Sequence, residues 1–144
     1  MRQWVLMHYR IPNQPSAGRV YIWRKMKSLG AKLLHDSVWV LPYTPRTYEQ
    51  FQWLATEISD LKGEAMLWQA SLTLREQEDQ LIEQFSATVL GEYEDILADL
   101  QASQANLAEL ARRYHQVKIK DYFGCALGQQ VYEILLQKRE ESQE

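Results

Sequence analysis

Hydrophobic positions in the first 72 residues follow the period of a strand in some segments and that of a helix in others. Trp4–Tyr9 is a short apolar and aromatic run that ends just before a proline, which is typical of a buried strand. Ala31–His35 and Val38–Pro42 predict a hairpin with a tight turn at Asp36-Ser37. The alternation over Glu64–Leu72 predicts a fourth strand.

Two helices are predicted between these strands. Ser16 begins the first helix and Gly30 ends it, and its inward positions are expected to be Val20, Trp23, Met26 and Leu29. Thr44 and Pro45 begin the second helix and Gly63 ends it, with Phe51, Leu54, Ile58 and Leu61 facing inward. The resulting order of strands and helices predicts an α+β fold with a ferredoxin-like βαββαβ core, whose two helices cover one face of an antiparallel sheet.

From residue 73 the pattern becomes that of a helical extension. A long helix is predicted whose inward apolar residues are Leu81 or Ile82, then Phe85, Val89, Tyr93, Ile96 and Leu100. Gly91 lies inside this helix and is expected to mark a bend or break. A further helix follows around Leu110 and Tyr114, and a last one covers about Ala126–Lys138. We predict a single domain over 1–144, with the core at 1–72 and the extension or a second copy covering the open sheet face.

Charge is distributed unevenly along the 144 residues, whose net charge is −3. Residues 1–62 hold nine Lys/Arg against four Asp/Glu, whereas residues 63–111 hold one against ten. Such asymmetry favours either an anion-binding face or docking between copies, and an uneven scatter of solvated charges is the alternative. The single cysteine, Cys125, indicates a reduced, cytoplasmic setting, and we expect no membrane span or export signal.

Basic side chains around the first helix are the candidate nucleic-acid contacts. They are Arg10, Arg19, Arg24, Lys25, Lys27 and Arg46, with Arg112 and Arg113 as second contributors. Cations on one face neutralise phosphates without reading the sequence of bases. The alternative is that these are ordinary solvated residues.

Other chemistry finds less support in the sequence. The five tryptophans fall on predicted strands or apolar stripes, so we expect them in the core and not on a platform for stacking bases. The end of the first strand reads His8-Tyr9-Arg10 and offers no carboxylate for a nuclease metal. Cys125 has no second cysteine and is expected to pack as a small apolar residue. We therefore expect no catalytic residues, metal or cofactor.

An ordered set of short segments resembles the N-terminal domain of ChrB, the regulatory protein of bacterial chromate-resistance operons. The segments are Tyr9–Pro12, Pro15-Ser16, Arg19-Val20, Trp23-Arg24, Leu29–Ala31, Val38–Pro42, Pro45–Thr47, Gly63–Trp68, Leu110–Tyr114 and Asp121–Phe123. The resemblance implies a DNA-associated, transcription-regulating domain with a fold similar to Cas2 and PaaX-type modules. It also implies that longer members carry a second domain associated with chromate sensing, which a chain ending at Glu144 is expected to lack.

These observations predict a non-enzymatic, DNA-associated regulatory module with weak, micromolar, salt-sensitive binding to duplex DNA. The alternative is a homodimeric protein-interaction scaffold that binds no nucleic acid, with the sheet face and the helix at 73–104 as its interface.

Overall fold

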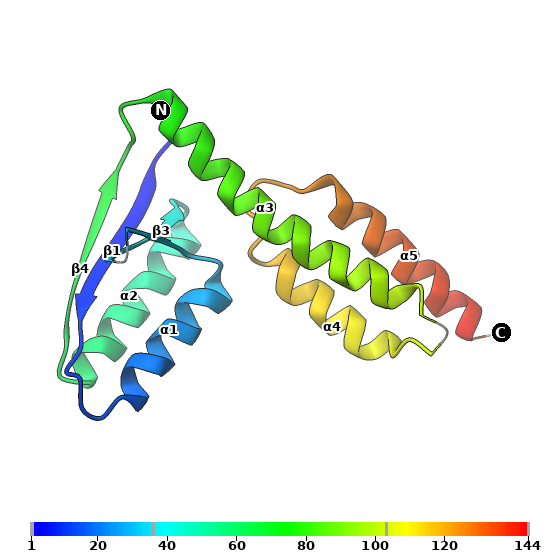
Figure 1. Cartoon of the computed structure of the whole chain (residues 1–144), viewed down its shortest axis with the longest axis horizontal. Coiled ribbons are helices and arrows are strands. Elements are labelled where there is room, and N and C mark those ends of the chain that lie inside the picture. The colour runs from blue at the N-terminus through cyan, green and yellow to red at the C-terminus, as the bar shows by residue number, and fades with distance from the viewer. Residues whose placement is uncertain (1, 36, 103, 144) are drawn as a thin grey trace. The chain divides into compact units, whose positions relative to one another are not determined.

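The computed structural model describes residues 2–35, 37–102 and 104–143. Asp36, predicted in the hairpin turn, lies outside the described residues. The chain divides into two compact units, Met1–Glu78 and Asp79–Glu144 (Figure 1). We call them the sheet unit and the helical unit.

The sheet unit contains the predicted elements in the predicted order. They are β1 (Trp4–Arg10), α1 (Ala17–Leu29), β2 (Lys32–Leu34), β3 (Val38–Pro42), α2 (Pro45–Asp60) and β4 (Glu64–Ala70). β2 is shorter than predicted, because His35 has a φ of 51° and leaves the extended conformation. The fold is therefore a mixed α+β arrangement, as the hydrophobic periods predicted.

The four strands form one antiparallel sheet in the order β2-β3-β1-β4. β1 lies between β3 and β4, with Trp4 opposite Pro42 on one side and opposite Ala70 on the other. α1 and α2 lie on one side of this sheet (Figure 1).

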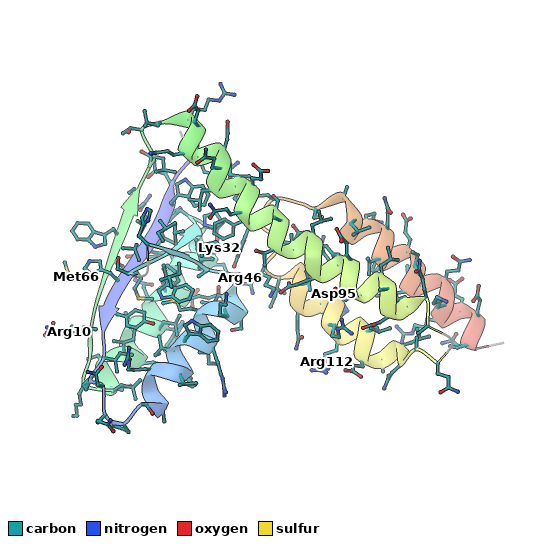
Figure 2. All side chains as sticks on the ribbon, in the orientation of Figure 1. Arg10, Lys32, Arg46, Met66, Asp95 and Arg112 are labelled. Atoms are coloured by element: carbon teal, nitrogen blue, oxygen red, sulfur yellow. The ribbon has the colours of Figure 1, made fainter. Side chains whose placement is uncertain are left out.

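The strand register assigns alternate residues to two different faces. Val5, Met7 and Leu41 belong to the face under the helices and have no exposed surface. Leu6, His8, Met66 and Trp68 share the other face, which we call the open face. Figure 2 shows Met66 directed away from α1 and α2. The sheet unit therefore has its core between the helices and one face of the sheet.

The inward stripe of α1 differs from the predicted one. Ile22 and Met26 are buried, whereas Val20 and Trp23, predicted inward, are exposed. A Cβ added to Gly18 would lie 3.2 Å from the Leu61 side chain, so the small residue lets α1 approach the end of α2. The helix therefore buries positions four residues apart and not three. Gly30 ends it at a φ of 79°, as predicted.

α2 begins as its sequence predicted. Thr44 caps the helix, its hydroxyl accepting a hydrogen bond from the Thr47 backbone N–H at 3.0 Å, and Pro45 occupies the first helical turn. The buried Thr47 hydroxyl donates to the Pro42 carbonyl at 2.7 Å, which joins the helix start to the end of β3. Phe51, Leu54 and Ile58 are buried as predicted.

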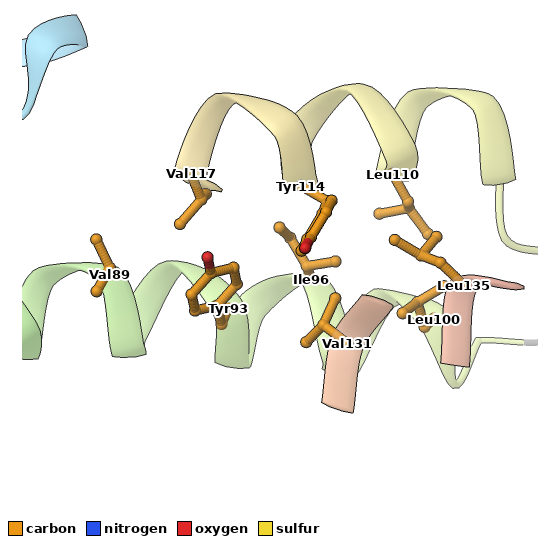
Figure 3. Packing of buried hydrophobic residues seen from close by; sticks show 9 residues of the cluster. All are labelled: Val89, Tyr93, Ile96, Leu100, Leu110, Tyr114, Val117, Val131 and Leu135. Atoms are coloured by element: carbon orange, nitrogen blue, oxygen red, sulfur yellow. The ribbon is translucent and has the colours of Figure 1, made fainter. Parts of the chain in front are cut away.

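The helical unit packs three helices around one core. They are α3 (Arg75–Leu100), which begins shortly before the unit boundary, α4 (Leu107–Lys118) and α5 (Ala126–Ser142). The core combines Val89, Tyr93, Ile96 and Leu100 of α3 with Leu110, Tyr114 and Val117 of α4 and Val131 and Leu135 of α5 (Figure 3). The inward residues predicted for α3 are confirmed.

Two details of the helical unit correct the sequence expectations. α3 continues through Gly91, which therefore marks no break, and α5 continues past Lys138 to Ser142. Over the described residues, no helix has the length and apolar character that crossing a membrane requires.

A hydrogen-bonded group joins α3 to the start of α5. The buried Tyr93 hydroxyl donates to Asp121 Oδ2 at 3.0 Å, and the Cys125 backbone N–H donates to Asp121 Oδ1 at 3.0 Å. A Cβ on Gly128 would lie 2.8–2.9 Å from the Tyr93 ring, so only glycine allows this approach of α5. Asp121 thereby accepts hydrogen bonds from the buried Tyr93 hydroxyl and from the backbone N–H at the start of α5.

Candidate nucleic-acid interface

The outer surface of α1 alternates cations with aromatic rings. Lys25 Nζ lies 5.5 Å from the centre of the Tyr21 ring, and Lys27 Nζ lies 5.5 Å from the centre of the Trp23 ring. Each pair is spaced four residues apart, which brings side chains together on one helix face. Arg19 and Arg24 are exposed on the same helix. The structure therefore brings four predicted contacts, Arg19, Arg24, Lys25 and Lys27, onto one solvent-exposed helix.

A surface groove of about 620 Å³ lies at the N-terminal half of this helix. Its polar lining residues are Arg10, Asn13, Ser16 and Arg19, and its apolar ones are Tyr9, Ile11, Val20, Trp23, Leu33 and Trp39. Within the described part of the chain, the lining holds two arginines and no carboxylate. The lining therefore offers guanidinium groups to an anionic group and apolar side chains to a flat apolar one.

Arg19 is held at the groove by its neighbours. Its Nη1 donates to Asn13 Oδ1 at 3.0 Å, so the loop before α1 orients the guanidinium. Burial raises the pKa of Tyr9 from its ordinary 10.0, while a hydrogen bond with the Trp39 side chain and the positive charge of Arg19 lower it in part. The guanidinium is therefore close enough for its charge to act on groups inside the groove.

The two remaining predicted contacts differ in position. Arg10 lines the groove, and its Nη2 donates to Glu64 Oε2 at 3.1 Å in an ion pair whose side chains are both largely exposed. Such exposed pairs are weak, so an incoming phosphate can compete for Arg10. Arg46 is exposed in the first turn of α2 and is not among the groove residues (Figure 2). The structure thus groups Arg10 and Arg19 but leaves Arg46 apart.

The second contributors belong to the helical unit. Arg113 Nη1 donates to Asp99 Oδ2 at 2.6 Å, and both residues form a salt bridge between α3 and α4. Arg112 is exposed on α4. Arg113 therefore already has a carboxylate partner within its own unit.

Other chemistries find few suitable groups. Among the described residues, no group of three or more His, Cys, Asp or Glu side chains is placed to hold a metal ion. His8, at the end of β1, stacks on Trp68 with ring centres 6.0 Å apart. Cys125 is half-buried at the start of α5.

Sequence reasoning missed the aromatic part of the groove. A three-residue spacing places Trp23 in the core, yet its side chain is 49% exposed and lines the groove. Trp53 and Trp68, also predicted inside, are 65% and 52% exposed, whereas Trp4 and Trp39 are buried as predicted. The small residue Gly18, four positions before Ile22, was the available signal for the correct stripe of α1.

Comparisons with known proteins identify the family. The family model described as "Protein ChrB, N-terminal" matches residues 19–122, from α1 to the segment after α4. Protein ChrB of Cupriavidus metallidurans is 26% identical over 106 residues, which cover 74% of this chain and 32% of that protein. The chain thus spans about a third of the relative that it matches. No solved structure matches. With most of its length covered by the family model, the chain belongs to the ChrB N-terminal family.

Proposed function

We propose that this chain is a non-enzymatic, DNA-associated regulatory module of the chromate-resistance type, acting in the cytoplasm. The observation that carries the proposal is the groove with two arginines and the exposed Trp23 ring, on a helix that also presents Arg24, Lys25 and Lys27. Phosphate neutralisation by such cations supplies binding without base readout. Membership of the ChrB family supports the chromate-resistance context.

The finer description of the fold belongs to the same proposal. The order β2-β3-β1-β4, with neighbouring strands antiparallel and a helix after β1 and after β3, supports a ferredoxin-like core. We propose on this basis that the sheet unit is related to Cas2 and PaaX-type modules. The His8-Tyr9-Arg10 sequence at the end of β1 supports a binding role and not a metal-dependent nuclease role.

A salt titration of DNA binding tests this function. Fluorescence anisotropy with a labelled duplex should give micromolar affinity at low salt that weakens steeply as salt rises. The double substitution Arg19→Gln/Lys27→Gln should weaken binding and reduce the slope of log K against log salt by about 2, since each phosphate contact contributes roughly 0.9.

A control variant that loses the same number of positive charges elsewhere distinguishes lost phosphate contacts from a change in net charge. Lys118→Gln/Arg139→Gln removes one exposed lysine from α4 and one exposed arginine from α5, neither of them a predicted contact, and should leave the salt slope unchanged. Equal losses in both variants would assign the effect to net charge. No binding of the unchanged chain at low salt would refute the proposed function.

A protein-interaction scaffold is the second candidate. It is favoured by the open face of the sheet, where Met66 and Trp68 are each about half exposed. In this alternative the contact between copies, and not a nucleic acid, is the functional event.

A further inference from the structure

The two edges of the sheet are built very differently. β2, at one edge, is three residues long and includes Lys32. β4, at the other edge, is seven residues long and contains no lysine, arginine, proline or glycine. Natural proteins usually protect edge strands by making them short, charged or bulged, because unpaired backbone groups invite another strand. β4 carries one charged residue, Glu64 at its first position, so its edge is less protected than that of the short β2.

The side chains of β4 also favour a partner. Met66 and Trp68 are 53% and 52% exposed and lie on the open face. The Trp68 ring stacks on the His8 ring of β1, and this contact restricts its orientation. Two large apolar side chains thus lie on the edge strand, of which Figure 2 labels Met66.

We propose that β4 pairs antiparallel with β4 of a second copy of this chain, with Leu67 at the two-fold axis. Leu67 is the midpoint of Glu64–Ala70, so this register pairs every residue of the strand. Met66 then lies opposite the partner's Trp68, Ala65 opposite the partner's Gln69, and Glu64 opposite the partner's Ala70. The two sheets become one continuous sheet.

The strand sequence favours a second copy as the occupant. In the centred register, the large apolar residues meet one another on the open face, and no two charges of like sign are opposed. The charge of Glu64 is already paired with Arg10 of its own chain. Moving the register by two residues leaves two residues of each strand unpaired and separates Met66 from the partner's Trp68. The centred pairing is therefore the most favourable one.

Pairing through β4 does not require DNA, so the oligomeric state of the free chain can be tested separately from the proposed function. Light scattering after size exclusion should show the mass of two chains at high concentration, falling to one on dilution, because an edge contact is at the small end of stable interfaces. The double substitution Met66→Lys/Trp68→Lys places lysines of one copy directly opposite lysines of the other and should give a single-chain mass. Met66→Glu/Trp68→Glu should do the same.

Mixing the two variants distinguishes repulsion from misfolding. The two new lysines of one chain would face the two new glutamates of the other, so the mixture should recover the mass of two chains. A monomeric unchanged chain, a dimer that survives in either variant alone, or a mixture that stays monomeric would each overturn the proposal.

Cross-linking tests the register itself. In a Cys125→Ser background, Leu67→Cys should form a disulfide between copies under oxidising conditions, because directly opposed Cα atoms are about 4.5–5.5 Å apart. Gln69→Cys is the control, since the two copies of residue 69 would lie roughly 13 Å apart along the strands. Cross-linking of residue 69, or of neither, would overturn the centred register.

Discussion

The sheet unit exposes three of its tryptophans, although it buries Trp4 and Trp39, whereas the helical unit encloses two tyrosines in its core. Trp23, Trp53 and Trp68 of the sheet unit are each about half exposed or more, and each lies at a groove, on a helix surface or beside the β4 edge. In the helical unit, Tyr93 and Tyr114 are buried in the core between three helices. Exposed aromatic rings are typical of binding surfaces, whereas enclosed ones contribute mainly to stability.

The two units also differ in how their cations are paired, because the ion pair of Arg10 with Glu64 in the sheet unit is largely exposed. The groove of the sheet unit is lined by Arg10 and Arg19. In the helical unit, the cations Arg113 and Lys120 are paired with Asp99 and Glu92 at 2.6 and 2.7 Å. These pairs join α3 to α4 and to the segment after it. Under the proposed function, the groove arginines are more available to a ligand than Arg113 and Lys120, which have carboxylate partners within the helical unit.

The largest expected effect comes from removing one aromatic ring from each unit. Tyr93→Ala should lower the free energy of unfolding by about 3–5 kcal/mol, because a large buried ring leaves a cavity. Trp53→Ala should change it by less than about 1 kcal/mol, because the ring is 65% exposed. Urea titrations followed by far-UV circular dichroism measure both. Similar losses in the two variants would refute the contrast between the units.

Tryptophan fluorescence sharpens this measurement. All five tryptophans lie between residues 4 and 68, so their emission follows the sheet unit alone. If the helical unit can unfold separately, Tyr93→Ala will move the circular dichroism transition and leave the fluorescence transition in place.

A smaller effect is expected from two glycines of the helical unit. Gly128→Ala should destabilise the chain by about 1–3 kcal/mol, because the new methyl group would press on the Tyr93 ring. Gly91→Ala should stabilise it by up to about 1 kcal/mol, because alanine favours the helix and nothing lies within 4 Å of the added carbon. Thermal unfolding of both variants gives the sign of each change in stability. Two changes of the same sign would contradict the packing described for α5.

Most of the fold could be predicted from the sequence. Strand and helix periods were sufficient for the element order, and the caps at Thr44 and Gly30 act locally, so their residues specify them directly. The inward stripe of α3 was also predictable, because a core between three helices selects apolar residues at regular spacing.

The candidate site was less predictable for a physical reason. α1 carries apolar side chains on more than one face, so periodicity could not decide which face is buried. The choice depends on Gly18 meeting Leu61, a contact with the end of α2 that only the tertiary structure reveals. The burial of Trp53 and Trp68 was unpredictable for the same reason. It depends on which other elements pack against their helix or strand and not on the sequence of that segment.

The smallest predicted effect compares one buried phenol from each unit. Burial, and next the charge and hydrogen bond of Asp121, raise the pKa of Tyr93 well above its ordinary 10.0. For Tyr9, burial raises the pKa, but the Trp39 hydrogen bond and the charge of Arg19 act against it. Because a carboxylate lies beside Tyr93 and a guanidinium acts on Tyr9, Tyr93 should keep its phenolic proton to a higher pH than Tyr9.

The sign of the pH dependence follows from the raised pKa values. Above pH 10 the unfolded chain loses phenolic protons that the folded chain keeps, so the free energy of unfolding falls as pH rises, by about 1.4 kcal/mol per pH unit for each such phenol. Tyr93→Phe should remove more of this alkaline loss than Tyr9→Phe. Urea titrations of both variants at several pH values from 9 to 11 measure the slopes. A larger flattening by Tyr9→Phe would mean that Arg19 does not act on the groove phenol, which would weaken the case for an anion site there.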